Sequence, residues 1–328
     1  MAGNQRVYKQ RIRSTQTLQK VFRAMELIAS SRIGQARRNA HEASPYDHAL
    51  SHAVAAVGSY ASLDHPILAE IAEHSGNPRV AVLVCTSDRG MAGAYSATIL
   101  RESERLLAQL VEEGKEPVVY TFGRRAQSYF SFRGRPIERA WTGESDRPTE
   151  ATMAEVSTTL LDAFMATAEE GGVGEVHIVF TRYVSMVSQV PEVRRMLPLT
   201  VVDVEEPEDS EDSEDSEGAH GGAHHDEAGV QGEGPAASPT LPLYEFEPSA
   251  EEVMQALLTR YAASRIRNAI LQSAASELAS RQQAMHTATE NADELIITYT
   301  RLANAARQGD ITQEITEIVS GADALGSG

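Results

Sequence analysis

A short polar loop near the first quarter of the chain carries the residues best suited to chemistry. It reads Ser87-Asp88-Arg89-Gly90-Met-Ala-Gly93 and follows an apolar run of strand length. A glycine-bearing turn between a strand and a helix can bind phosphate, because the N–H groups at a helix N-terminus attract anions. The loop lacks both the G-x-G-x-x-G pattern and the lysine of a P-loop. We therefore expect a tight structural turn rather than a nucleotide site, formed by Ser87, Asp88, Arg89, Gly90 and Gly93.

Two other groups of residues could be reactive. Cys85 is the single cysteine, so no intrachain disulfide is possible and a reducing compartment is expected. It ends an apolar strand, where a thiol is inert. Histidines 220, 224 and 225, beside Asp226 and Glu227, could hold a metal, but a solvated linker is the favoured interpretation of so polar a tract. The sequence thus indicates no catalytic residue, no metal and no cofactor.

The elements around the polar loop predict an α/β domain over residues 77–204. Continuous apolar runs at 80–85, 117–122 and 176–180 are typical of parallel strands buried on both faces. Between them, residues 97–113 and 149–168 carry apolar side chains at helical spacing. Alternation of strands and helices predicts a small, doubly wound, mostly parallel sheet. Residues 197–204 are expected to add a last strand at an edge.

The two ends of the chain predict long helices. All thirteen prolines fall between Pro45 and Pro248. Over residues 5–43 apolar side chains recur at spacings of three and four, and the helix could continue past Pro45 to about residue 60. The stripe consists of Leu18, Val21, Phe22, Met25, Ile28, Ala29, Ile33 and Ala36. We assign residues 1–60 to this first helix.

The final segment, 249–325, is the longest proline-free stretch. Ser249 and Glu252 form a capping box at its start. One seven-residue repeat comprises Leu271, Leu278, Met285, Ala292 and Tyr299, and a second comprises Ala274, Ala288, Leu295 and Leu302. Arg281 occupies the second register, where a charge needs a partner, and Glu26 of the first helix is a candidate. A heptad seam of this kind predicts a coiled coil.

The first and last helices should pair with each other in antiparallel fashion, because the domain between them returns the chain to its start. The last helix is longer, so at about 1.5 Å per residue some 30 Å of it should project beyond its partner. The projecting residues include Ile311, Ile315, Ile318 and Val319, which form an apolar stripe. Either another protein surrounds this stripe or it folds back, and an exposed apolar face this long favours the first.

Charge is distributed very unevenly. Residues 205–238 contain twelve Asp or Glu and no Lys or Arg, and without them the net charge of −18 falls to −6. We expect the tract 205–240 to be a disordered insert. Residues 1–38 instead hold nine Lys or Arg against a single Glu26. Overall acidity argues against general nucleic-acid binding, and no apolar run approaches the length of a membrane span.

Three motifs resemble those of one known family, the gamma subunits of F-type ATP synthases. The C-terminal run Arg307-Gln308 followed by Ile311-Thr-Gln-Glu-Ile-Thr-Glu-Ile-Val-Ser-Gly321-Ala is similar to that family's C-terminal signature. Arg11-Ile-Arg-Ser14 and the stretch from Gln19 to Ser31 resemble its N-terminal signature, and the polar loop after the first strand resembles a third. The chain departs from the usual pattern at Ala305 and at Gly309-Asp310.

The resemblance implies a central rotor shaft, a coiled coil inside a ring of alternating alpha and beta subunits. It implies that the α/β domain forms a foot that binds epsilon and the membrane c-ring, at the cytoplasmic face of the bacterial plasma membrane. It also implies that this chain binds no nucleotide and catalyses nothing. The residues that it places against the catalytic ring are Met25, Arg307, Gln308, Ile311, Thr312, Glu314, Ile315, Ile318 and Val319.

The residues themselves leave other interpretations open. By spacing alone, Met25 belongs to the packed stripe of the first helix, and Arg307 and Gln308 could belong to a solvated helix face. An α/β nucleotide-binding enzyme with a coiled-coil dimerisation arm is the main alternative for the whole chain. It would require a phosphate site around Asp88 and Arg89. A generic coiled-coil scaffold is a further alternative, but it would not explain the three motifs in order.

Overall fold

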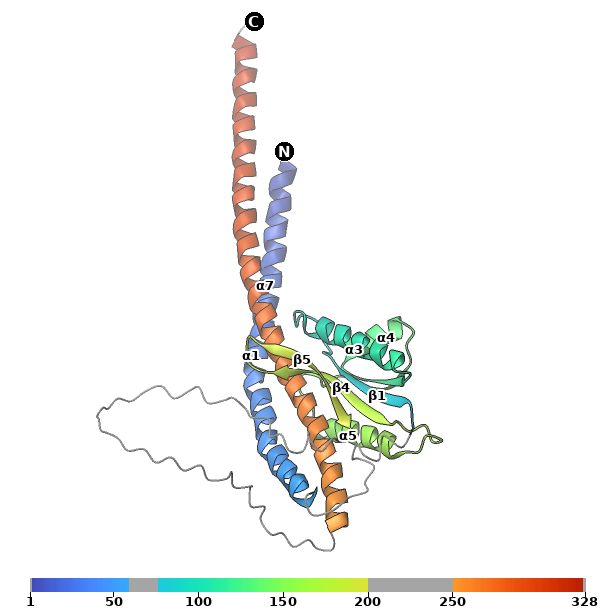
Figure 1. Ribbon diagram of the computed structural model, residues 1–328. Helices are drawn as coiled ribbons and strands as arrows, with labels where there is room; N and C mark the ends of the chain where they lie inside the picture. Colours follow the sequence, from blue (N-terminus) through green and yellow to red (C-terminus); the bar gives the residue numbers. More distant parts are fainter. Residues whose placement is uncertain (1, 59–75, 200–249, 327–328) are drawn as a thin grey trace, which may run out of the picture.

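Two long helices run side by side and carry a small α/β domain on their flank (Figure 1). The structure is a computed structural model that describes residues 2–58, 76–199 and 250–326. Helix α1 spans Ala2–Gly58 and helix α7 spans Ala250–Gly326. The two chain termini lie toward the same end of the pair, so the helices are antiparallel, as the sequence predicted (Figure 1). Together we call α1 and α7 the shaft.

The predicted start of α7 and the acidic insert cannot be compared with the structure. Ser249 and residues 205–240 lie outside the described residues. Helix α1 continues through Pro45 to Gly58, the longer of the two extents that the sequence allowed. Among the described residues, no helix is long and apolar enough to cross a membrane.

The α/β domain, residues 79–197, is called the foot domain below. It contains a five-stranded sheet in the order β3-β2-β1-β4-β5. The strands are β1 (Arg79–Cys85), β2 (Glu116–Phe122), β3 (Ile137–Trp141), β4 (Glu175–Tyr183) and β5 (Gln189–Leu197). The first four pair in parallel, and β5 runs antiparallel to β4 at an edge.

The position of the edge strand differs from the prediction. The sequence placed it at 197–204, whereas β5 ends at Leu197 and residues 200–204 lie outside the described part. Most residues of β5 are only half-buried, and Glu192, Arg194 and Arg195 interrupt any continuous apolar run. Pro191 lies within β5, which an edge strand tolerates because one row of its N–H groups needs no ladder partner.

Helices cover both faces of the sheet. Helices α3 (Tyr95–Glu112) and α4 (Arg124–Phe132) pack on one face, where Val82 and Val84 of β1 contact a cluster with Ile99 and Phe130. Helix α5 (Glu150–Met165) lies on the other face. There the apolar cluster continues into α7 through Leu258, Ile266 and Ile270. The lower part of α7 is therefore both half of the shaft and a core helix of the foot domain.

Small side chains set the contact between the two shaft helices at the level of the foot domain. Ala29, Ile33 and Ala36 of α1 pack with Ala275, Leu278 and Ala279 of α7. Small residues at facing positions allow close approach of two helix backbones. Farther along, polar and aromatic pairs join the helices, including Glu26 with His286 at 2.9 Å and Tyr8 stacked on Tyr299.

Only part of the predicted heptad seam is buried. The first register stays inside, with Leu271, Leu278, Met285 and Ala292 all at most 5% exposed. Beyond Ala288, α1 no longer covers the second register, and Leu295 and Leu302 are 46% and 41% exposed. A straight helix turns every 3.6 residues, so a seven-residue repeat drifts by about 20° per heptad. With one partner helix rather than two, the drifting register is left uncovered.

Candidate partner-contact surface

The end of α7 projects beyond the described start of α1 as a single helix (Figure 1). Ala303, at 6% exposure, is the last buried apolar residue along α7 within the described part of the chain. From there to Gly326 the helix extends about 35 Å at 1.5 Å per residue. Arg307, Gln308, Thr312 and Glu314 are all exposed on this segment.

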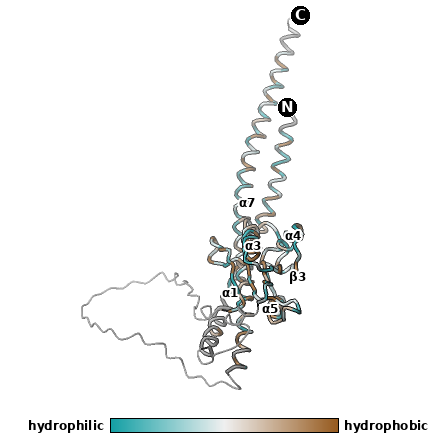
Figure 2. Tube along the Cα trace, turned by 45° about the vertical axis from the view of Figure 1, so that its right-hand side comes forward, coloured by the Kyte–Doolittle hydropathy of each residue, from teal (hydrophilic) through white to brown (hydrophobic). Residues whose placement is uncertain are grey.

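The projecting segment has one apolar face. Ile311, Ile315, Ile318 and Val319 are 44%, 56%, 70% and 54% exposed. Their spacing of four, seven and eight residues places them on one side of the helix. We call these four residues the tip face. The other side is polar, and there Gln313 donates a hydrogen bond to Glu317 at 2.9 Å. Hydrophobic and hydrophilic residues alternate along the trace of the shaft helices (Figure 2).

The hydroxyl groups near the tip face are already bonded to the helix itself. Thr312 donates to the carbonyl oxygen of Gln308 at 2.9 Å, and Thr316 donates to that of Thr312 at 2.8 Å. Such bonds satisfy the hydroxyl without using another chain. The side chains of Arg307 and Gln308, one turn below the tip face, carry the polar groups best placed to reach a partner.

The stripe predicted on α1 divides between two environments. Ala29, Ile33 and Ala36 are buried, while Phe22 and Met25 are half-buried. Leu18, Val21 and Ile28 are 46–50% exposed, and Leu27, which lies outside the predicted stripe, is 65% exposed. The apolar surface of α1 is thus wider than the contact with α7. Its width was visible in the sequence as the pair Leu27-Ile28, but the periodicity did not show which half faces outward.

The basic residues of α1 are exposed along this same upper half of the shaft. Arg6, Lys9, Arg11, Arg13, Lys20 and Arg23 all lie on the surface. Arg11 also lies over the ring of Tyr299 at 5.6 Å, a cation–π contact with α7. The upper shaft therefore presents apolar patches bordered by positive charge.

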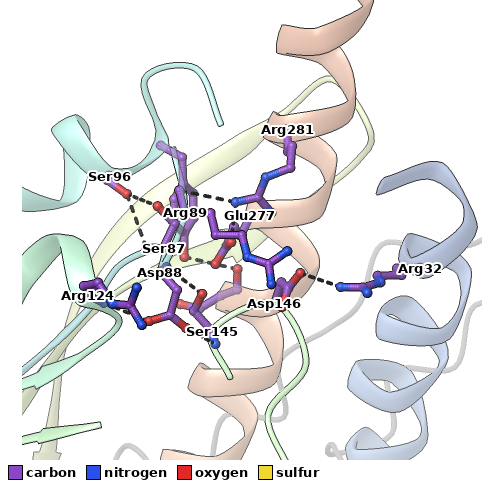
Figure 3. Close-up of polar contacts among 12 residues, drawn as sticks. Arg32, Ser87, Asp88, Arg89, Ser96, Arg124, Ser145, Asp146, Glu277 and Arg281 are labelled. Atoms are coloured by element: carbon purple, nitrogen blue, oxygen red, sulfur yellow. Dashed lines mark hydrogen bonds and ion pairs between the residues drawn. The ribbon is translucent and has the colours of Figure 1, made fainter. Parts of the chain in front are cut away.

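The polar loop of the foot domain lies far from the tip face, beside the middle of α7 (Figure 1, Figure 3). Within it, Ser87 is buried, and its hydroxyl shares a 2.7 Å hydrogen bond with Ser96. Gly93 adopts φ of +57°, in the left-handed region that favours glycine. A Cβ on Gly90 would lie 2.6 Å from the guanidinium of Arg125. Backbone conformation thus accounts for Gly93, whereas a side chain at position 90 would require the Arg125 side chain to move.

The carboxylate of Asp88 occupies the N-terminus of helix α4. One oxygen accepts from the N–H of Arg124 at 3.0 Å, and the other accepts from the N–H groups of Gly143 and Ser145 at 2.8 and 2.9 Å. Burial by itself raises the pKa of Asp88, but these hydrogen bonds stabilise the anion and bring the pKa below its ordinary value. The N-terminus of α4 is thus occupied by the protein's own carboxylate.

Arg281 pairs within its own helix, so the suggested partner Glu26 is wrong. Its guanidinium lies 2.6 Å from Glu277, four residues earlier, with the two side chains 4% and 1% exposed (Figure 3). It also donates to the carbonyl oxygen of Arg89 at 3.4 Å. Glu26 instead contacts His286. An i, i+4 pair needs no second element, and it was visible in the sequence.

Burial dominates the ionisation of this pair. Desolvation raises the pKa of Glu277 to about 7, and the nearby charge of Arg281 offsets only part of that effect. Cys85 is buried too, which raises its pKa to about 12 and keeps it in the unreactive thiol form. Neither residue faces an open site with the geometry of a catalytic group.

Comparison with known proteins agrees with this architecture. The family model described as ATP synthase matches residues 4–325. The ATP synthase gamma chain of Beutenbergia cavernae is 57% identical over 325 residues, covering 99% of both chains. That of Micrococcus luteus is 49% identical over 326 residues, again covering 99% of both.

Solved structures show the same fold. A chain in the Euglena gracilis mitochondrial ATP synthase, from a structure of its OSCP, F1 and c-ring, matches with a TM-score of 0.62 and 16% identity. The match covers 99% of this chain and 95% of that one. A chain in the central stalk and c-ring of the Tetrahymena thermophila mitochondrial enzyme matches with a TM-score of 0.51 and 18% identity, covering 82% and 99%. On the full-length matches in sequence, the chain belongs to the ATP synthase gamma chain family.

Proposed function

We infer that this chain is the central rotor subunit of a proton-translocating F-type ATP synthase. In this role it is a non-catalytic subunit that transmits torque between the membrane c-ring and the catalytic ring of alpha and beta subunits. Membership in the gamma chain family supports the role. A pair of packed helices suits it, because two helices joined by side-chain contacts resist bending and twisting better than one.

The observation that carries the proposal is the uncovered tip face. Four large aliphatic side chains lie on one side of a single helix, each at least 44% exposed. An apolar surface of this kind marks a protein contact. We propose that the catalytic ring surrounds it as an apolar sleeve. Few directional bonds would have to break there as the shaft turns, so the friction of each step would be small.

Polar groups just below the tip face would act as a catch. Arg307 and Gln308 are exposed and lie next to the apolar face. We propose that they hydrogen-bond a loop of a beta subunit, while Thr312 and Glu314 flank the contact. Met25, half-buried on α1, would meet the ring lower on the shaft. The exposed basic residues of α1 are suited to carboxylates on the partner subunits.

The foot domain lies away from the tip, on the flank of the lower shaft (Figure 1). We propose that this end of the molecule binds epsilon and the c-ring. The chain would then be held at the cytoplasmic face of the bacterial plasma membrane as a peripheral subunit, through the complex rather than by a span of its own.

The alternative of a nucleotide-binding enzyme has weaker support. It needs an open anion site in the polar loop, and the Asp88 carboxylate of that loop already accepts from the backbone N–H groups of Arg124 and Gly143. A phosphate there would face a negative charge. Calorimetric titration of the purified chain with ATP separates the two proposals, since the enzyme requires micromolar affinity and the rotor requires none.

The rotor proposal is tested with charges introduced on the tip. Ile315→Asp with Ile318→Asp puts two carboxylates into the proposed sleeve, where burying an unpaired charge is strongly unfavourable. We expect the complex in inverted membrane vesicles to lose ATP-driven proton pumping. Gln313→Asp, on the opposite side of the same turn, is the matched control and should pump normally. Normal pumping by the double variant would exclude the sleeve.

Met25→Lys and copurification provide two independent tests. A lysine at position 25 should reduce pumping more than it reduces ATP hydrolysis, because it adds a charge where the shaft would face the ring. Purification from native membranes should recover this chain together with alpha and beta subunits. Its absence from that complex would refute the rotor role itself, whereas normal pumping by Met25→Lys would refute only the contact.

A further inference from the structure

A loop of the foot domain, residues 143–146, reaches both helices of the shaft (Figure 3). It follows β3 and lies between the polar loop after β1 and the middle of α7. Three of its residues make side-chain or backbone hydrogen bonds to other elements. We call these residues, together with their partners Arg32 and Asp88 and the nearby α7 pair of Glu277 and Arg281, the joint.

The first connection of the joint leads to helix α1. Nη1 of Arg32 lies 2.8 Å from Oδ2 of Asp146, with the two side chains 43% and 20% exposed. The two residues are separated by 114 positions in the chain. This ion pair joins the foot domain to α1, next to the apolar contact of Tyr183 and Met186 with Ala29, Ile33 and Ala36.

The second connection leads to helix α7. On α7, Glu277 and Arg281 form a buried ion pair at 2.6 Å. Arg281 in turn donates to the carbonyl oxygen of Arg89 in the polar loop. The polar loop thus contacts α7 directly, and Asp88 ties this loop to Ser145 of loop 143–146.

Contacts with α7 alone attach the foot domain to only one of the two shaft helices. Burial beneath α5 and β4 holds α7, and so do hydrogen bonds such as that from Ser276 to the carbonyl oxygen of Thr181 at 3.0 Å. Hydrogen bonds and ion pairs have defined geometry. Anchors on two different helices prevent rotation about either helix axis, which an anchor on one helix would not do.

We propose that torque passes between the foot domain and the shaft through the joint. Ser145 and Asp146 of loop 143–146 are its positioning residues. The inference rests on the rotor role and adds to it the contact that fixes the orientation of the foot domain relative to the shaft. Asp146 holds α1, and Ser145 holds Asp88 of the polar loop, which contacts α7 through Arg89 and Arg281. Loss of either anchor lets the foot domain lag behind the shaft under load, while the unloaded structure remains intact.

The test uses the assembled complex in inverted membrane vesicles. The measured quantity is the initial rate of ATP-driven proton pumping divided by the rate of ATP hydrolysis in the same vesicles. Asp146→Lys places like charges opposite Arg32, and this ratio should fall by about two- to threefold, the scale of one partly exposed ion pair. The double variant Arg32→Glu with Asp146→Lys restores opposite charges and should recover most of the ratio.

A matched control separates the joint from a general effect of surface charge. Glu155→Lys breaks the ion pair between Arg139 and Glu155. This pair is also on the foot domain, and both of its side chains are 47% exposed. Its ratio should stay at the wild-type value. An unchanged ratio in Asp146→Lys, no recovery in the double variant, or an equal loss in the control would each overturn the proposal.

Assembly is measured in the same preparations. If Asp146→Lys fails to assemble, the isosteric Asp146→Asn takes its place, and its ratio should fall in the same direction. Failure of the wild-type chain to copurify with alpha and beta subunits would count against the rotor role. A complex that assembles and pumps normally with Asp146→Lys and Asp146→Asn would count against the joint alone.

Discussion

Asp88 and Ser145 are joined by two hydrogen bonds in opposite directions. The N–H of Asp88 donates to the Ser145 hydroxyl at 2.8 Å, and the N–H of Ser145 donates to the Asp88 carboxylate at 2.9 Å. The reciprocal arrangement is that of a capping box, but it connects two loops that are 57 residues apart. One carboxylate thereby fixes the segments after β1, after β3 and before α4.

Asp88→Asn should destabilise the foot domain. The amide group of asparagine presents N–H groups to at least one of the three backbone donors, so a buried N–H loses its acceptor. We expect the free energy of unfolding to fall by about 1–3 kcal/mol, as measured by urea denaturation of the purified chain. Asp162→Asn, an exposed change on α5 in the same domain, is the control and should have almost no effect.

The lowered pKa of Asp88 predicts that its contribution to the stability of the foot domain decreases at acidic pH. Because the pKa of Asp88 is lower in the folded protein than in the unfolded chain, its stabilisation is present above the ordinary aspartate pKa and is lost as pH falls through the folded value. The stability difference between wild type and Asp88→Asn should therefore be constant near neutrality and shrink below about pH 4. A difference that does not change between pH 7 and pH 3 would contradict this account.

Gly123→Ala should disrupt the turn that leads into α4. Gly123 has φ of +99°, and a Cβ there would lie 2.0 Å from the carbonyl oxygen of Thr86. The steric overlap and the strained backbone together predict a loss of about 3 kcal/mol or more. Gly134→Ala is the matched control, since its φ is also positive but nothing lies within 4 Å of the added carbon. It should cost only about 1–2 kcal/mol, and equal losses in the two variants would refute the steric argument.

Glu277→Gln should change how stability depends on pH. Burial raises the pKa of Glu277 to about 7, so the folded protein binds a proton more tightly than the unfolded chain does. The stability that Glu277 contributes is therefore full below about pH 4.5 and is lost as pH rises through 7. Relative to Glu277→Gln, wild type should lose about 1–3 kcal/mol between pH 5 and pH 8.

The measurement for Glu277 is denaturant unfolding of both chains across that pH range. Ser276→Ala removes a buried hydroxyl that donates to the carbonyl oxygen of Thr181 at 3.0 Å and has no charge to titrate. Its effect should be the same at every pH. A Glu277→Gln difference that is also flat with pH would show that Arg281 keeps the carboxylate ionised throughout.

Gly309→Ala should stiffen the projecting end of α7. Gly309 lies within the helix, and nothing lies within 4 Å of a carbon added there. Alanine favours a helix over glycine by about 1 kcal/mol, so local opening should slow by about fivefold. Hydrogen exchange of the peptide around residues 303–320 measures this directly. Gly34→Ala in the paired part of α1 is the control and should leave exchange at the tip unchanged.

The sequence predicted the elements with strong periodicity or continuous apolar runs. Strands β1, β2 and β4 were found because they are buried on both faces, and the two shaft helices because proline is absent or sparse and apolar residues recur at helical spacing. Strand β3 was missed, since Ile137-Glu-Arg-Ala-Trp141 is a short edge strand with charged residues in its middle. Its neighbour α4 was missed as well, because nine residues give too few turns for a clear pattern.

The joint could not have been predicted from spacing. Arg32, Asp88, Ser145 and Glu277 come from four separate regions, and only the topology of the sheet and the antiparallel shaft brings them together. The tip was predictable for the opposite reason. Its character follows from local sequence, the spacing of Ile311 and Ile315, and from the difference in length between the two helices. Interactions within one helix can be predicted from sequence more readily than those between distant loops.

The unequal lengths of the shaft helices give the rotor a gradient of elasticity. Where α1 and α7 are packed together, the shaft consists of two helices side by side. Beyond Ala303 the shaft consists of α7 alone, and this single helix resists twisting only through its own backbone hydrogen bonds. A given torque therefore twists the segment beyond Ala303 more per residue than it twists the paired part of the shaft.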